Sequence, residues 1–340
     1  MAPPSDAPQG RPSIYDVARR AGVSHMTVSR VLNEHPNIRP ATRQRVLQAI
    51  DELGYRRSTI ARALATKRTM RIGVLVDANM EYGPSATLRA LEAAARQSGY
   101  SVTTVSIDDV DSDVSGAVDF VTQGVDAFCV IAPRESSVAM LRTLNGRPPA
   151  LVITSDPEES MHTVGVDQRA GTRLAMEHLI ALGHRRILHL TGPLDWVDAR
   201  AREQQWHASL TAAGLPIPTP AEGDWSADSG YEVGLHHPGI DDATAVFASN
   251  DQMALGLLHG LRERGLRVPA DISVVGFDDI ADARHYCPPL TTVRQDFAAL
   301  GSTAMAQLEQ AISSGGSITH HTIPTELVVR ASTAPAPSGR

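Results

Sequence analysis

The length, composition and charge of the chain limit the classes of protein that it can form. It has 340 residues, a formal net charge of -7 at pH 7 and two cysteines. This length is enough for two or three domains with separate hydrophobic cores. No apolar run reaches the roughly 18 residues of a membrane-spanning helix. The first residues lack the apolar core of a secretion signal, so we expect a cytoplasmic protein without a membrane partner.

The two cysteines are Cys129 and Cys287. Cys129 lies in the apolar run 128–131, which favours a buried thiol over a disulfide partner.

The charge is distributed unevenly along the chain. Residues 1–70 carry a net charge of +7, and the remaining residues carry -14. Such a split favours a nucleic-acid-binding head on an acidic body. Composition alone leaves a solvated charged surface open as the alternative.

The first 57 residues predict a short leader and three helices. Residues 1–12 are rich in Pro, Ser and Gly and are expected to be disordered. Ser13 and Asp16 have the spacing of a capping box, followed by an apolar stripe of Ile14, Val17 and Ala18. Gly22 is expected to end this first helix.

The second helix is expected to begin after a Ser24 cap and to run to about Asn33. Pro40 suits the first turn of a third helix that ends before Gly54. One face of this third helix is predicted to be apolar, formed by Val46, Leu47, Ile50 and Leu53. Residues 55–69 are mostly basic and polar and resemble a linker with one short helix.

The first two helices have the spacing of a helix-turn-helix. Ala18 is small where the helices cross, Gly22 supplies the turn, and Val23 and Val28 pack underneath. The outward side chains of the second helix suit DNA. Phosphate contacts are expected from Ser24, Thr27 and Ser29, and base contacts from His25, Met26 and Arg30. A helical hairpin of another kind of module is the structural alternative.

From residue 71 the pattern changes to apolar runs that alternate with amphipathic helices. The runs cover 72–76, 102–107, 127–132, 150–153, 187–190, 245–248 and 272–275. This alternation predicts parallel α/β sheets. About 260 residues are more than one such sheet needs, so we expect two Rossmann-like lobes.

The motif Val-Ser-x-x-Thr-Val-Ser-Arg-Val-Leu-Asn at 23–33 resembles the recognition helix of the LacI/GalR family of bacterial repressors. Segments 41–55 and 61–64 resemble its third helix and its hinge helix. The resemblance implies that Asn33 also faces DNA and that Leu64 wedges into the minor groove. Two departures are Arg57-Ser58, where the family commonly has Pro-Asn, and Arg39, where a serine usually caps the third helix.

The resemblance continues to about residue 330. It implies an N-terminal all-α helix-turn-helix head and an α/β two-lobed periplasmic-binding-protein-like core with two parallel-sheet subdomains. The expected boundaries are a disordered leader at 1–12, the helix-turn-helix domain at 13–57, a hinge helix and linker at 58–70, the effector-binding and dimerisation core at 71–330 and a disordered tail at 331–340. Because the chain ends in a Pro-, Ser- and Ala-rich segment rather than leucine heptads, we expect a homodimer.

Polar residues after two of the predicted strands suggest a ligand site. Asn250 and Asp278 follow the runs 245–248 and 272–275, and ligands of open parallel sheets bind beyond the carboxyl ends of strands. The full set of candidate effector-binding residues is Asp77, Arg202, Trp225, Asn250, Asp278, Gln295 and Phe297. Charged and amide groups suit sugar hydroxyls, and aromatic faces suit a pyranose ring. Helix capping, core packing, a surface ion pair or an ordinary loop position are the alternative explanations.

The segments 223–226 (Gly-Asp-Trp-Ser) and 295–297 (Gln-Asp-Phe) are similar to galactoside-responsive members of the family. Thr154 stands where those members have an aspartate, and Trp196 and Asp198 replace two serines. The expected effector is therefore a galactoside or another β-linked glycoside.

The sequence contains no string typical of a catalytic site, so we expect no enzyme. The pairs His236-His237 and His320-His321 lack further spaced ligands, so no metal and no cofactor are expected. The favoured function is a repressor of sugar-utilisation genes that a sugar releases from a palindromic operator. A transport-type sugar-binding protein is the alternative, and a sugar kinase ranks third.

Overall fold

The structure is a computed structural model, which describes residues 12–33, 35–55, 68–77, 81–107, 116, 119, 121–131, 134, 148–156, 161–314 and 317–337. The chain divides into two compact units, Met1–Thr69 and Met70–Arg340. Within the described residues, no helix combines the length and the apolar character needed to cross a bilayer. Leu64 and the hinge helix expected around it lie outside the described residues, as do residues 1–11 of the leader.

The first unit, which we call the head, contains α1 (Ile14–Ala21), α2 (His25–Leu32) and α3 (Pro40–Leu53). The predicted capping box is present, since Ser13 accepts from the Asp16 backbone and Asp16 accepts from the Ser13 backbone. Ser24 caps α2, and Gly22 adopts the left-handed conformation between the two helices at φ 65°. Arg39 makes no side-chain cap on α3, as its sequence suggested.

The core of the head explains how such short helices hold together. It consists of small and β-branched side chains of all three helices: Val17, Ala18, Ala21, Val28, Val31, Val46 and Ala49. The prediction that Leu47 belongs to the apolar face of α3 is wrong, because this side chain is 51% exposed. The buried face of α3 is instead centred on Val46 and Ala49, with Ile50 and Leu53 partly buried beside them.

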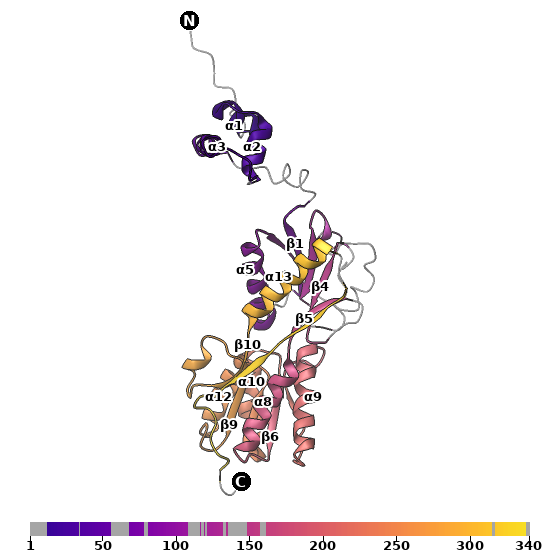
Figure 1. Cartoon of the computed structure of the whole chain (residues 1–340). Coiled ribbons are helices and arrows are strands. Elements are labelled where there is room, and N and C mark those ends of the chain that lie inside the picture. Colours follow the sequence, from indigo (N-terminus) through magenta and orange to yellow (C-terminus); the bar gives the residue numbers. More distant parts are fainter. Residues whose placement is uncertain are drawn as a thin grey trace. The chain divides into compact units, whose positions relative to one another are not determined.

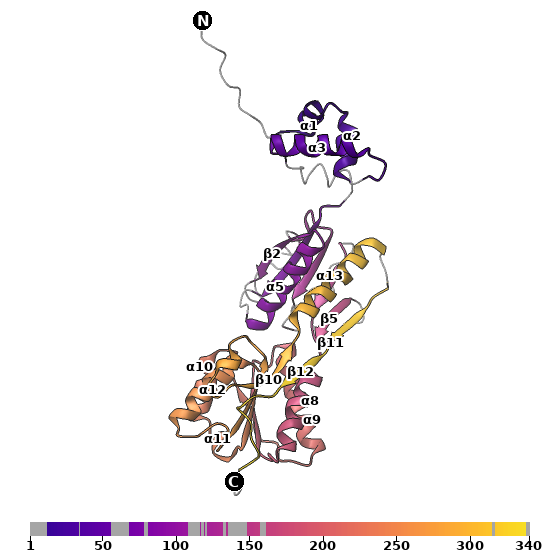
Figure 2. The ribbon, with the colours of Figure 1, turned by 60° about the vertical axis from the view of Figure 1, so that its left-hand side comes forward.

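The second unit contains two lobes, each built on one six-stranded sheet (Figures 1 and 2). The sheet of lobe 1 has the order β11-β5-β4-β3-β1-β2 and is parallel throughout. Its strands are β1 (Arg71–Asp77), β2 (Ser101–Ile107), β3 (Ala127–Ile131), β4 (Ala150–Ile153), β5 (His162–Val166) and β11 (His320–Ile323). Helices α5 (Tyr82–Gln97) and α13 (Phe297–Ser314) lie side by side on it.

The sheet of lobe 2 has the order β12-β10-β9-β8-β6-β7, and only β12 is antiparallel to its neighbour. Its strands are β6 (Ile187–Thr191), β7 (Ala221–Glu222), β8 (Ala245–Ala248), β9 (Ser273–Asp278), β10 (Thr291–Gln295) and β12 (Thr325–Val328). Helices α8 (Gln168–Ala181) and α9 (Val197–Ala212) cover one face. Helices α10 (Ala227–His236) and α12 (Asp251–Glu263) cover the other, with short helices at α11 (Gly239–Asp242) and η1 (Ala283–His285).

The chain passes between the lobes three times. It leaves lobe 1 between β5 and α8, returns between β10 and α13, and leaves again between β11 and β12. These crossings confirm a two-lobed core and place three backbone connections beside one another. The sequence pattern had marked most of the strands but not β5, β7, β10, β11 or β12.

The end of the chain was expected to be disordered from residue 331, and for residues 331–337 this expectation is wrong. Ser332 is completely buried, and its hydroxyl donates to the Val274 carbonyl and accepts from the Thr291 backbone N–H. The imidazoles of His178 and His184 bond to Thr333 and Ala334. Composition misled here because backbone and hydroxyl groups, rather than apolar side chains, hold this segment to lobe 2.

Ser332→Ala should lower the free energy of unfolding by about 1–3 kcal/mol, because it leaves the buried Thr291 N–H without its acceptor. Denaturant unfolding followed by circular dichroism measures this change. The control is Ser302→Ala, at an exposed position of α13, which should stay within about 0.5 kcal/mol of the parent. Equal stability of the two variants would contradict the structural role of the tail.

Candidate functional site

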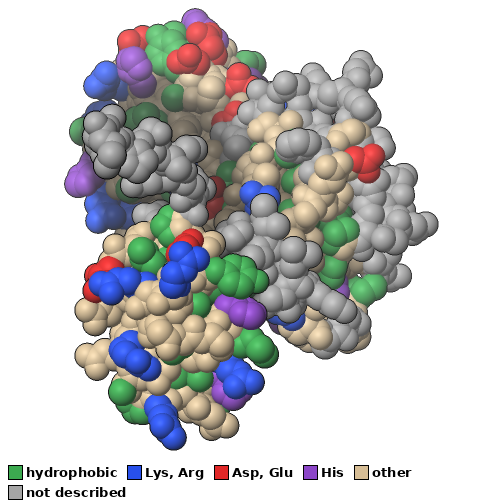
Figure 3. Space-filling model, turned by 90° about the horizontal axis from the view of Figure 1, so that it is seen from above, with side chains coloured by type: hydrophobic (Ala, Val, Ile, Leu, Met, Phe, Trp, Pro, Cys, Tyr) green, Lys and Arg blue, Asp and Glu red, His purple; other side chains and the backbone are tan. Residues whose placement is uncertain are grey.

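The outer face of α2 presents the candidate DNA-contacting residues to solvent. Those that are exposed are Ser24, His25, Met26, Arg30 and Asn33, while Thr27 and Ser29 are half-buried. The Ser24 hydroxyl is 3.0 Å from that of Thr27 and accepts from the Thr27 backbone, so it also caps the helix. Figure 3 shows Lys/Arg, histidine and hydrophobic side chains interspersed over the surface of the head.

One exposed residue of the head escaped the sequence analysis. Tyr15 is 61% exposed, and its ring centroid lies 5.2 Å from that of His25. Tyr15 follows Ile14 directly and lies outside the apolar stripe of α1. This position off the stripe is the feature of the sequence that could have indicated an exposed ring. An exposed aromatic ring beside the start of α2 extends the candidate interface onto α1.

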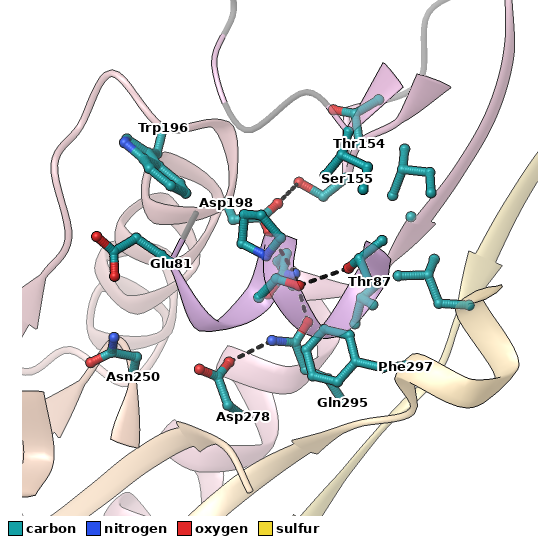
Figure 4. A pocket seen from close by; sticks show the side chains of 18 of the residues that line it. Glu81, Thr87, Thr154, Ser155, Trp196, Asp198, Asn250, Asp278, Gln295 and Phe297 are labelled. Atoms are coloured by element: carbon teal, nitrogen blue, oxygen red, sulfur yellow. Dashed lines mark hydrogen bonds between the residues drawn. The ribbon is translucent and has the colours of Figure 1, made fainter. Parts of the chain in front are cut away.

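A cavity that opens to solvent lies between the two lobes of the second unit (Figure 4), with about 680 Å³ of empty space when the adjoining solvent is included. Its lining includes six of the seven candidate effector-binding residues: Arg202, Trp225, Asn250, Asp278, Gln295 and Phe297. Asp77 is not among the lining residues, and its carboxylate lies 3.6 Å from Arg134 Nε instead. The strand ends and the interlobe crossings thus bring together residues far apart in sequence.

Asp278 and Arg202 are charged groups buried together in the cavity wall. They are only 5% and 4% exposed. Gln295 Nε2 donates to Asp278 Oδ1 at 2.6 Å. Burial raises the pKa of Asp278 to about 7, although the charge of Arg202 favours its ionised form. The cavity therefore contains a carboxyl group that titrates near neutral pH.

Arg202 is held in place from several sides. Its Nε donates to Gln168 Oε1 at 3.0 Å, and its Nη1 donates to the Ser249 carbonyl. Its guanidinium lies 3.9 Å from the centroid of the Phe277 ring, a cation–π distance. Burial lowers its pKa, while the nearby Asp278 raises it. Arg202 is therefore a fixed part of the wall.

Asn250 combines capping with lining the cavity. Its Oδ1 accepts from the Met253 backbone at 2.7 Å, and its Nδ2 donates to the Trp225 carbonyl at 2.9 Å. Asn250 therefore does cap α12, as the alternative explanation held. The bond to Trp225 adds a second role, because it fixes the backbone of an aromatic residue of the same cavity.

Aromatic side chains form much of the cavity wall. The rings of Trp196 and Trp225 meet edge to face at 5.4 Å, and Phe297 meets Tyr82 in the same way at 5.9 Å. A Cβ atom on Gly192 would lie 2.2 Å from the Trp225 ring, so only glycine fits there. Such faces suit the C–H side of a sugar ring.

Backbone strain coincides with this site. Trp225 has φ 74° and Asp278 has φ 112°, a region that residues with side chains rarely adopt. Conformations of this kind persist where the surroundings hold them and are common at binding sites. The strain therefore sets Trp225 and Asp278 apart from ordinary core residues.

The cavity also contains residues that the sequence analysis did not select as ligand-binding. The polar ones are Glu81, Thr87, Ser155 and Gln168, and the positions noted as departures (Thr154, Trp196 and Asp198) lie there too. Gln168 follows a crossing that no strand pattern marked, so sequence spacing offered no signal for it. Burial, together with the nearby Asp224 and Asp77, raises the pKa of Glu81.

The charges of the lining favour a particular kind of ligand. Among its described residues, carboxyl groups come from Glu81, Asp198 and Asp278, and the only cation is the engaged Arg202. Carboxylates accept hydrogen bonds from hydroxyls, whereas an anionic ligand would need a cation that is not already bonded. The cavity suits an uncharged polyhydroxylated molecule with an apolar face.

No group of three or more metal-ligating side chains occurs in the described part of the chain. Each histidine pair has other contacts. His320 Nδ1 bonds to Thr163, and His321 Nε2 bonds to Gln307. His236 lies near Glu232, and His237 accepts from the Gly239 backbone.

Two family models match the chain. The model of bacterial regulatory proteins, lacI family, covers residues 13–58, and that of a periplasmic binding protein-like domain covers residues 176–333. The lactose operon repressor of Escherichia coli (strain K12) is 38% identical over 94% of this chain and 90% of its own length. The chain belongs to the LacI family of bacterial regulatory proteins.

Other relatives and solved structures agree with this membership. Catabolite control protein A of Priestia megaterium is 34% identical over 87% of the chain and 91% of its own length. A lac repressor dimer bound to operator and an anti-inducer matches 96% of this chain and all of its own, with a TM-score of 0.83 and 36% identity. A CelR–cellobiose complex matches 95% of the chain and all of its own, with a TM-score of 0.71 and 30% identity. This LacI-family chain thus shares its head and its two-lobed core with known regulators.

Proposed function

We propose that this LacI-family protein is a homodimeric repressor that binds a palindromic operator and is released from it by an uncharged sugar. The observation that carries the proposal is the presence, in one chain, of an exposed helix-turn-helix face and a cavity lined by carboxylates and aromatic rings. One such head reads a half-site, and two-fold symmetry lets two heads read a palindrome. The operator lies on the chromosome, so the proposal includes a cytoplasmic location.

The head supports DNA binding through its exposed side chains. Arg30 can form two hydrogen bonds to O6 and N7 of a guanine, and His25 and Met26 are exposed nearer the start of the helix. The proposal also assigns residues 58–70 to a hinge with Leu64 at the operator centre. A transport-type sugar-binding protein would have no use for this head, so that alternative explains less.

The cavity supports a β-linked glycoside, with a galactoside as the leading candidate. Asp278 and Asp198 offer acceptors, Asn250 and Gln295 offer amide groups, and Trp225 offers a flat apolar face. Relatives are named for lactose and ribose operons, and one is solved with cellobiose. Asp198 and Trp196 make this lining more acidic and more aromatic than two serines would, which leaves the identity of the sugar to experiment.

The direct experiment is gel retardation of palindromic DNA fragments selected by the protein, with lactose, cellobiose, methyl β-D-galactoside and ribose as candidate releasing agents. Arg30→Ala should weaken binding to the selected fragment by about 1–3 kcal/mol per half-site and should lose discrimination at one base pair. Arg19→Ala, which removes an 81%-exposed arginine paired with Asp16, is the matched control. Failure of the parent protein to retard any selected fragment would contradict the proposal. Equal weakening on all sequences would make Arg30 a phosphate contact.

Effector affinity should depend on pH through Asp278. Its pKa is raised to about 7, so the carboxylate that accepts sugar hydroxyls forms as the pH rises from 6 to 8. Because the sugar stabilises the ionised form, its dissociation constant should fall roughly ten-fold over this range. Calorimetric titration measures the change. Asp278→Asn should bind weakly at every pH, while Asp242→Asn, at an exposed site, should keep the dependence. A pH-independent affinity in the parent would remove Asp278 from the binding set.

A further inference from the structure

A line of side-chain hydrogen bonds joins the two lobes through the cavity wall. Ser155, which follows β4 in lobe 1, donates to Asp198 Oδ1 at 2.5 Å (Figure 4). The other carboxylate oxygen of Asp198 accepts from Gln168 Nε2 at 3.2 Å. Asp198 lies in the first turn of α9, so this contact ties lobe 2 to lobe 1 independently of the backbone crossings.

Gln168 is the branching point of this line. It is 2% exposed, and its Nε2 donates both to Asp198 and to Gln295 Oε1 at 3.2 Å. Its Oε1 accepts from Arg202 Nε at 3.0 Å. A guanidinium only donates and a carboxylate only accepts, so these charges fix the orientation of the amide. Gln295 in turn donates to Asp278, so two amides in series, Gln295 and Gln168, connect the carboxylates of Asp278 and Asp198.

The two amides also occupy particular places in the chain. Gln168 is the first residue of α8, just after the first crossing between the lobes, and Gln295 is the last residue of β10, just before the second. A change in the angle between the lobes moves these backbone positions. The geometry of the bonds therefore depends on how the lobes fit together.

We propose that Gln168 is a positioning residue that links occupancy of the cavity to the contact between the lobes. This inference rests on the proposed function. A sugar hydroxyl that donates to Asp278 or Asp198 competes for lone pairs that the amides of Gln295 and Gln168 use. The filled and empty cavities then differ in how firmly Asp198 is held against Ser155. That difference supplies the unequal affinity for two lobe arrangements that any ligand-driven shift requires.

The first test needs no sugar. Ser155→Ala, Gln168→Ala and the double variant are compared in the unfolding equilibrium constant of the full-length protein. Ser155 and Gln168 lie in different lobes and act through the same carboxylate. The double variant should therefore lose less than the product of the two single losses. Multiplicative losses would show that the two side chains act separately and would overturn the proposal.

The second test measures the response of the operator complex, with lactose as the probe. The quantity measured is the operator dissociation constant with saturating lactose divided by the constant without it, and such coupling factors are typically about 5–150-fold. In Gln168→Ala this ratio should be at least about five-fold smaller than in the parent protein, and so closer to one. Gln168→Glu keeps the size and the acceptor for Arg202 but removes the donor, so it should show the same loss even if the alanine variant folds poorly. The control is Gln204→Ala, because Gln204 is exposed and its amide contacts Arg169.

The outcomes separate the two proposals. If lactose does not change the operator affinity of the parent protein, this result counts against a galactoside effector. The comparison of unfolding constants among the single and double variants then decides the role of Gln168. Gln168→Glu could instead bind lactose more weakly while lactose, at saturation, still changes its operator affinity as much as in the parent protein. Gln168 would then be a ligand contact without a role in coupling, and the inference would be overturned. If lactose also failed to change the operator affinity of Gln204→Ala, the effect would come from α8–α9 packing in general, and the inference would again be overturned.

Discussion

The burial of two opposite charges between the lobes is the constraint on which the core depends. Arg202 and Asp278 have left water almost completely, and each is held by hydrogen bonds from residues next to the crossings between the lobes. Burying a charged group without hydrogen bonds is costly, and the amides of Gln168 and Gln295 offset part of that cost here.

The head and the core divide recognition between them. The head has a core of small side chains, and the residues proposed to contact DNA lie on the exposed face of α2, beside the exposed ring of Tyr15. The core offers a cavity whose carboxylates and rings suit a sugar. Its lobes are connected by three backbone crossings and by the series of side-chain hydrogen bonds that includes Ser155–Asp198. The family membership explains why these parts occur in one chain, and the cavity lining explains why its effector need not be that of a relative.

Much of the fold could be predicted from the sequence because local signals were strong. Ser13, Gly22 and Ser24 mark helix ends through their own backbone chemistry, and apolar runs mark central strands. β11 was missed because it is short, polar and at the edge of its sheet, and β5, the next strand inward, was missed because His162, Thr163 and Gly165 interrupt its apolar pattern. Gln168 was missed for a different reason. Its role comes from the meeting of α8, α9 and β10, which no spacing within one segment reveals. The tail at 331–337 was misjudged because backbone groups, rather than apolar side chains, anchor it.

The central claim is that operator and sugar binding are linked through the core. Calorimetric titration of the releasing glycoside into the free protein, and into the protein saturated with operator, tests it directly. Linkage requires the operator to weaken sugar binding by the same factor by which the sugar weakens operator binding, typically about 5–150-fold. The account predicts equal factors in the two directions. Identical sugar affinity with and without operator would contradict it.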